Sequence, residues 1–163
     1  MLKLRKNKKG FTLVELIVVI AIMAVLAGTI AGVTVSQLNK QTDKTMATEA
    51  KGIADFISTW IIENNFDLST LATGKTIDDV KVSDDNTLMS ALGKQYGNKA
   101  VKKTENTVAA GTIAVSFVAG TDTNADVAKT KNVIKVEYKG KQSGTNGDVS
   151  YTVNVEGVVA KGA

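Results

Sequence analysis

Residues 11–35 read FTLVELIVVIAIMAVLAGTIAGVTV, a run of 25 residues in which Glu15 is the one charged side chain. Eighteen or more apolar residues in succession are the usual signal of a membrane-spanning helix. As a helix this run is about 37 Å long, whereas the hydrocarbon core of a bilayer is about 30 Å thick. We therefore expect residues 11–35 to span a membrane.

The residues before this run are strongly basic. Residues 1–10, MLKLRKNKKG, contain five basic residues and no acid, whereas residues 11–163 contain 15 basic and 16 acidic side chains, a net charge of −1. Positive charge beside a membrane helix favours the cytoplasmic side, so we expect the leader inside and the rest of the chain outside. The charge of +4 for the whole chain comes from this leader, and it does not indicate a nucleic-acid partner.

The composition argues against catalysis. The chain has no cysteine and no histidine, so it lacks a thiol nucleophile, the commonest general base and the commonest metal ligand. Asp122, Asn124 and Asp126 have the spacing that opens a calcium loop, but Val127 and Val133 stand where that loop needs a glycine and a glutamate. We therefore predict a solvated turn there, with no metal site, no cofactor and no enzymatic activity.

The helix is expected to continue beyond the apolar run. No proline occurs in the chain, and residues 36–65 keep a helical period up to a predicted stop at Asn64-Asn65. We expect Trp60 to belong to the core rather than to a binding platform. The apolar stripe of this segment falls at spacings of three and four: Met46, Ala50, Ile53, Ala54, Ile57, Trp60 and Ile61.

The last hundred residues predict a small head. Residues 84–87 offer helix N-cap chemistry before Leu88, with Gly97 as a possible stop. Three later segments, residues 113–117, 134–138 and 149–155, alternate with period two, and a polar loop at 139–148 joins the second and third as a hairpin. The predicted fold is α+β, a long N-terminal helix whose C-terminal half packs on a small antiparallel sheet of about three strands.

These patterns divide the chain into four parts: a basic leader at 1–10, an apolar helix at 11–35, its amphipathic continuation at 36–65, and a globular head at 66–163. Two simpler interpretations of the first 35 residues remain open. An ordinary secretory signal peptide also has a basic start and an apolar core, although that core has about 7–15 residues. A plain membrane anchor, with nothing removed, is the other.

The junction between leader and helix narrows the choice. Residues 8–15 read KKGFTLVE, which resembles the type III signal of type IV pilins and related pseudopilins. The resemblance covers about residues 5–35. It implies cleavage after Gly10 by a prepilin peptidase, N-methylation of Phe11, and the family's glutamate at the fifth mature position, Glu15.

The resemblance also gives roles to residues inside the helix. A carboxylate in an apolar helix usually has a partner, and cleavage creates one, the amine of Phe11 on a neighbouring subunit. We expect Glu15 and Phe11 to set the register between subunits, with a solvated helix-start carboxylate as the alternative. Gly28 and Gly32 suit close helix packing or local melting in the filament, as well as the simpler interpretation of tolerated small residues.

We predict a structural subunit, a pilin, that assembles through its N-terminal helix into a surface filament for adhesion, motility or biofilm formation. The expected partners are copies of itself in a helical filament, prepilin peptidase, the assembly machinery in the membrane, and membrane lipid before assembly. The alternatives are a pseudopilin of a type II secretion or DNA-uptake system and a membrane-anchored exported enzyme. The precursor is expected in the cytoplasmic membrane, and the mature subunit at the cell surface.

Overall fold

The computed structural model describes residues 10–103, 107–141 and 147–162. It divides into two compact units, Met1–Leu38 and Asn39–Ala163, and one long helix contributes to both. Apart from Gly10, the predicted leader lies outside the described residues.

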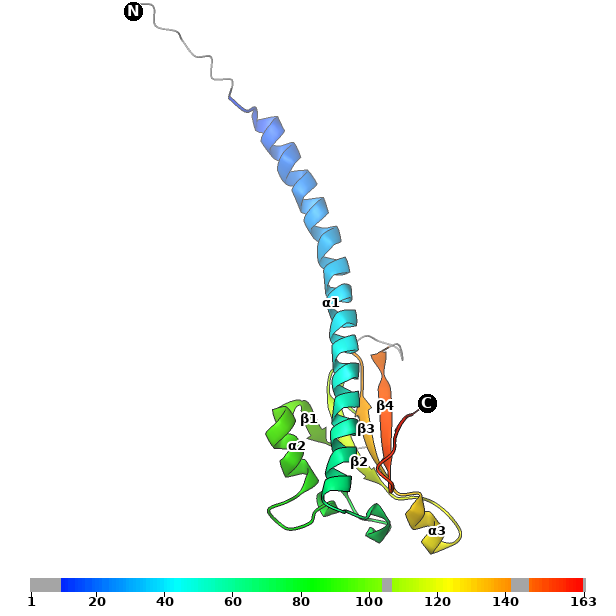
Figure 1. Ribbon diagram of the computed structural model, residues 1–163. Helices are drawn as coiled ribbons and strands as arrows, with labels where there is room; N and C mark the ends of the chain where they lie inside the picture. The colour runs from blue at the N-terminus through cyan, green and yellow to red at the C-terminus, as the bar shows by residue number, and fades with distance from the viewer. Residues whose placement is uncertain (1–9, 104–106, 142–146, 163) are drawn as a thin grey trace, which may run out of the picture. The chain divides into compact units, whose positions relative to one another are not determined.

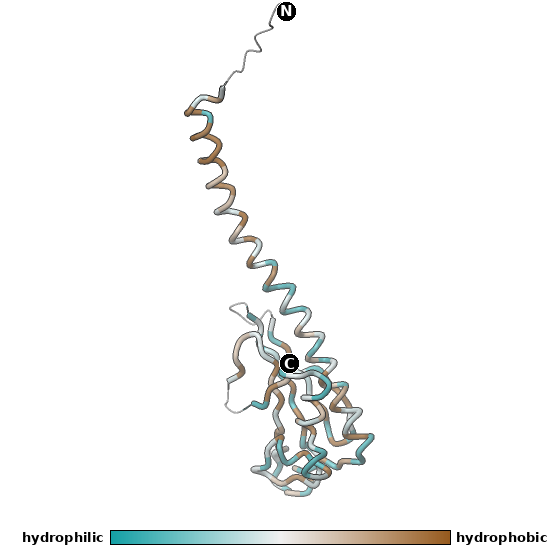
Figure 2. Tube along the Cα trace, turned by 90° about the vertical axis from the view of Figure 1, so that its left-hand side faces the viewer, coloured by the Kyte–Doolittle hydropathy of each residue, from teal (hydrophilic) through white to brown (hydrophobic). Residues whose placement is uncertain are grey.

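Helix α1 runs without interruption from Leu13 to Glu63 (Figure 1). All described residues of the first unit, 10–38, are exposed, and Figure 2 shows how strongly hydrophobic the beginning of this helix is. Within the described part of the chain, α1 is the one helix that is long and apolar enough to cross a membrane. Local sequence accounts for its continuity, because nothing in 51 residues removes a backbone donor as proline would.

The second unit, Asn39–Ala163, which we call the head from here on, is built around the later turns of α1. Trp60 is 5% exposed and its ring lies 5.9 Å from that of Phe66, which confirms the predicted core role. Met46 is half-buried and packs against the same core. The buried members of the stripe are among those predicted: Ala50, Ile53, Ala54, Ile57, Trp60 and Ile61.

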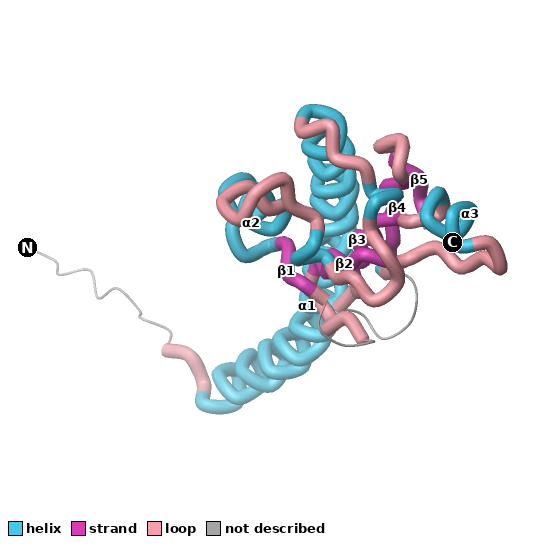
Figure 3. Tube along the Cα trace, turned by 90° about the horizontal axis from the view of Figure 1, so that it is seen from below, coloured by secondary structure: helices cyan, strands magenta, loops and turns pink. Residues whose placement is uncertain are grey.

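The stripe packs on one face of a five-stranded sheet in which the strands follow one another in chain order (Figure 3). The first pair of strands is parallel and the other three pairs are antiparallel. The strands are β1 (Ala100–Lys102), β2 (Ile113–Val118), β3 (Val133–Tyr138), β4 (Val149–Asn154) and β5 (Val159–Lys161).

The α+β class is confirmed, and the predicted sheet is corrected in two respects. The three expected strands are β2, β3 and β4, with Tyr138 opposite Val149 at the predicted hairpin. The sheet has two further strands, and β1 makes it mixed rather than antiparallel. Both extra strands have three residues, too few for alternation to be recognised in the sequence.

Helix α2, Leu88–Tyr96, begins and ends where its capping residues predicted. The Thr87 hydroxyl accepts a hydrogen bond from the Ser90 N–H at 3.0 Å, and Gly97 takes a positive φ of 59°. The Tyr96 hydroxyl donates to the Gly52 carbonyl at 2.9 Å, which fixes α2 against α1.

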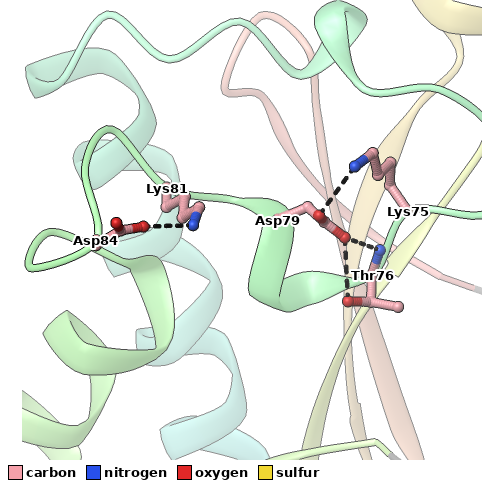
Figure 4. Close-up of polar contacts among 5 residues, drawn as sticks. All are labelled: Lys75, Thr76, Asp79, Lys81 and Asp84. Carbon is pink, nitrogen blue, oxygen red and sulfur yellow. Dashed lines mark hydrogen bonds and ion pairs between the residues drawn. The ribbon is translucent and has the colours of Figure 1, made fainter.

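Shorter helical turns complete the head: η1 (Leu68–Thr70), η2 (Ile77–Asp79), η3 (Gly97–Lys99) and α3 (Ala125–Thr130). At η2 the Asp79 carboxylate accepts hydrogen bonds from the Thr76 N–H at 2.7 Å and from the Thr76 hydroxyl at 3.2 Å (Figure 4). The backbone N–H of Thr76, and then Lys75, lower the pKa of Asp79. The N-terminus of η2 is therefore capped by a threonine and an acid three residues apart.

One buried carboxylate ties α1 to the β3–β4 connection. Asp43 Oδ1 accepts hydrogen bonds from the Tyr138 hydroxyl at 2.6 Å and from the Lys141 N–H at 2.9 Å. Burial first, and then the hydrogen bond and charge of Asp43, raise the pKa of Tyr138. A Cβ placed on Gly147 would lie 2.9 Å from Asp43 Oδ2, so glycine is needed where the chain passes this close.

Candidate functional site

The predicted processing site lies where α1 begins. Gly10, Phe11 and Thr12 are not helical, and α1 begins at Leu13. The Leu16 N–H donates to the Thr12 carbonyl at 3.3 Å, which is the geometry of an N-cap residue. Thr12 therefore marks the boundary between the non-helical junction and the helix.

Thr12 and Glu15 bond to each other in both directions. Glu15 Oε2 accepts hydrogen bonds from the Thr12 N–H at 2.7 Å and from the Thr12 hydroxyl at 2.9 Å, and the Glu15 N–H donates back to the Thr12 hydroxyl at 3.3 Å. This is a capping box. The role of Thr12 was not predicted from the sequence, although a threonine three residues before an acid at the start of an apolar run is the signal of a capping box.

This geometry gives Glu15 a partner within its own chain. In the described chain, Glu15 is an exposed carboxylate in the first turn of α1. A negative charge in the first turn is favoured by the helix dipole, and both Thr12 donors reduce the cost of holding it in an apolar segment. The pairing with a neighbour's Phe11 amine stays a prediction about the assembled fibre.

Gly10 and Phe11 are open to an external partner. Phe11 is 93% exposed, and a Cβ added to Gly10 would meet no heavy atom within 4 Å. The fold of this chain therefore has room for a side chain at residue 10. If glycine is required at residue 10, the requirement comes from a protein that binds the junction and not from the fold of this chain.

Gly28 and Gly32 lie in continuous helix. An added Cβ at either position meets nothing within 4 Å, so both are open to a neighbouring helix. The hydroxyls of Thr29 and Thr34 donate to carbonyls of the preceding turn, each at 2.9 Å. The described chain is helical here, within α1, and packing or melting at these glycines stays a prediction about the filament.

The acidic turn in the head uses its polar groups internally. Asp122 Oδ2 pairs with Lys131 at 2.7 Å, and Asn124 Oδ1 caps α3 by accepting from the Asp126 N–H at 3.0 Å. The hydrogen bond from Lys131, and then the Asn124 N–H, lower the pKa of Asp122. The described residues contain no group of three or more acids placed to share a metal ion.

An open hollow of about 530 Å³ lies along the sheet between Lys103 and Lys161. One of its lining residues, Glu137, accepts from Lys103 at 2.6 Å and from Lys135 at 2.8 Å. Burial acts to raise the pKa of Glu137, but the hydrogen bonds and the charges of the two lysines together outweigh it and leave that pKa lowered. The group is an ion-pair triad of one carboxylate and two ammonium groups rather than a pair of carboxylates held for acid–base catalysis.

The junction also matches a known family. The family model of the prokaryotic N-terminal methylation motif matches residues 5–31, which include Gly10, Phe11, Thr12 and Glu15. The chain carries the type IV pilin signal. This signal implies processing by a prepilin peptidase and assembly into a filament, and the apolar start of α1 fits a membrane-anchored precursor. No curated protein and no solved structure matched the chain.

Proposed function

We propose that this chain is the precursor of a type IV pilin, a structural and non-enzymatic subunit of a surface filament. The observation that carries the proposal is the methylation motif at residues 5–31, directly continuous with an apolar helix whose described residues through Leu38 are all exposed. An exposed apolar surface of this extent needs lipid or other proteins around it. Membrane lipid surrounds this surface in the precursor, and copies of the same helix surround it in the assembled filament.

Processing follows from the junction. Prepilin peptidase removes residues 1–10 by cleaving between Gly10 and Phe11, and Phe11 is then N-methylated. The non-helical backbone and the open surroundings of both residues support this assignment. The folded head, Asn39–Ala163, stays outside the membrane and becomes the surface of the filament.

Assembly depends on the helix. Glu15 pairs with the Phe11 amine of a neighbouring subunit, and this pair fixes the axial stagger because other staggers leave both charges without a partner. Gly28 and Gly32 allow the helices to approach closely or to lose helical order there. The filament serves adhesion, surface motility or biofilm formation.

Mass spectrometry of sheared surface filaments tests the proposal. The mature chain should begin at Phe11 and be about 14 Da heavier for each methyl group added. Gly10→Leu should block cleavage and leave the full-length precursor in the membrane. Because the fold has room for that side chain, the block would come from the peptidase and not from misfolding. A mature chain that keeps residues 1–10 would refute the processing. A short pseudopilus in place of surface filaments would assign the chain to a pseudopilin role.

A further inference from the structure

The helix start and the scissile bond are two residues apart. The Gly10–Phe11 bond is the proposed cleavage site. Thr12, the next residue after Phe11, caps the start of α1 through its mutual hydrogen bonds with Glu15. The first backbone hydrogen bond of the helix goes to the Thr12 carbonyl, so the Gly10 carbonyl precedes the hydrogen-bonded ladder. A carbonyl inside a helix is bonded to the N–H four residues on and is surrounded by side chains.

The sequence contains a competing helix start. Asn7 is a good N-cap residue, and a helix that began after it would include Gly10 and Phe11 in its first turn. That start would lack the reciprocal acid, because its third helical residue is Gly10, and would place Lys8 and Lys9 at the positive end of the helix dipole. Thr12 with Glu15 is the better start.

We propose that Thr12 is a positioning residue for processing: its capping box with Glu15 sets the helix start at Leu13 and so keeps the Gly10–Phe11 bond non-helical for the peptidase. The inference rests on the proposed cleavage after Gly10. It assigns Thr12 a function before cleavage, separate from the pairing of Glu15 after assembly.

The test uses the full-length precursor in detergent micelles with purified prepilin peptidase. Thr12→Val keeps the shape of the side chain and removes the hydroxyl. It should lower kcat/KM for cleavage about fivefold, which corresponds to the loss of about 1 kcal/mol of capping. NMR chemical shifts of Gly10 and Phe11 should become helical in this variant, because the helix start is no longer held at Leu13.

Two rescue variants separate capping from direct recognition. Thr12→Ser and Thr12→Asn differ in shape but both cap helices, so both should cleave at the wild-type rate. Thr76→Val is the matched control, because it removes a hydroxyl with the same relation to an acid, Asp79, within the head (Figure 4). It should leave cleavage unchanged.

Three results would overturn the proposal: normal cleavage of Thr12→Val, rescue by serine but not by asparagine, or unchanged shifts at Gly10 and Phe11. Rescue by serine alone would mean that the peptidase contacts the hydroxyl directly. If the wild-type precursor is not cut after Gly10, the proposed function itself fails. Normal cleavage of both the wild type and Thr12→Val refutes only the positioning role.

Discussion

Among single residues, Glu15 has two successive roles, one in the single chain and one proposed for the fibre. In the single chain it accepts two hydrogen bonds from Thr12, and in the fibre it is proposed to meet a neighbour's amine. The two uses need different chemistry. Capping needs a hydrogen-bonding side chain, which glutamine also supplies, whereas the fibre contact needs the negative charge.

Glu15→Gln should therefore separate them. We expect expression, membrane insertion, head folding and cleavage after Gly10 to stay normal, and the yield of sheared filaments to fall at least about tenfold, because the neighbour's amine loses its partner in a dry core. Glu15→Leu should lose filaments as well and should also cleave more slowly. Normal numbers of normally staggered filaments from either variant would contradict the register role.

At the scale of elements, the contact between α1 and the β3–β4 connection depends on Asp43. This carboxylate is 6% exposed and accepts from Tyr138 and from the backbone of Lys141. A buried donor that loses its acceptor costs about 1–3 kcal/mol. Removing the Asp43 carboxylate should therefore destabilise the head by more than the net stabilisation that its hydrogen bonds provide.

Asp43→Ala should lower the free energy of unfolding of the head by about 3 kcal/mol, and Tyr138→Phe by about 1.5 kcal/mol, since the latter leaves the Lys141 bond in place. Urea unfolding of the isolated head measures both. Asp55→Ala is the control on the same helix, because its carboxylate is 50% exposed and pairs with Lys51 at the surface. It should change stability by less than about 0.5 kcal/mol. Equal effects for Asp43 and Asp55 would contradict this account.

At the scale of the whole molecule, the head contains its own core. The second unit, Asn39–Ala163, includes the buried stripe of α1, α2 and the entire sheet. The long run of exposed apolar residues, by contrast, lies before it in the chain. A head without that run should therefore need neither detergent nor lipid.

Residues 37–163 should accordingly be monomeric and folded in aqueous buffer, as judged by light scattering and circular dichroism. In this fragment Trp60→Ala should cost about 3–5 kcal/mol, because a large buried ring leaves a cavity. Ile62→Ala, at a neighbouring side chain that is 60% exposed, should cost less than about 1 kcal/mol. Aggregation of the fragment would show that the head depends on the first unit.

The parts of the fold whose signals are local could be predicted from the sequence. The apolar run, the helical stripe through Trp60, the caps of α2 and the alternation in β2, β3 and β4 each depend on neighbouring residues, so a window of sequence contains them. The Gly10–Phe11 junction was recognised in the same way. The Thr12 capping box is equally local. It was not predicted, although the spacing of Thr12 and Glu15 is visible in the sequence.

The remaining features depend on contacts between residues that lie far apart in the sequence. Edge strands β1 and β5 exist because β2 and β4 offer them unpaired backbone groups, which no three-residue pattern reveals. Asp43 meets Tyr138 across 95 positions of sequence, and buried Asn132 donates to the carbonyls of Leu68 and Leu71, each at 2.9 Å. Such polar groups are placed by the closing of the core around them, so their partners are set by three-dimensional packing rather than by spacing along the chain.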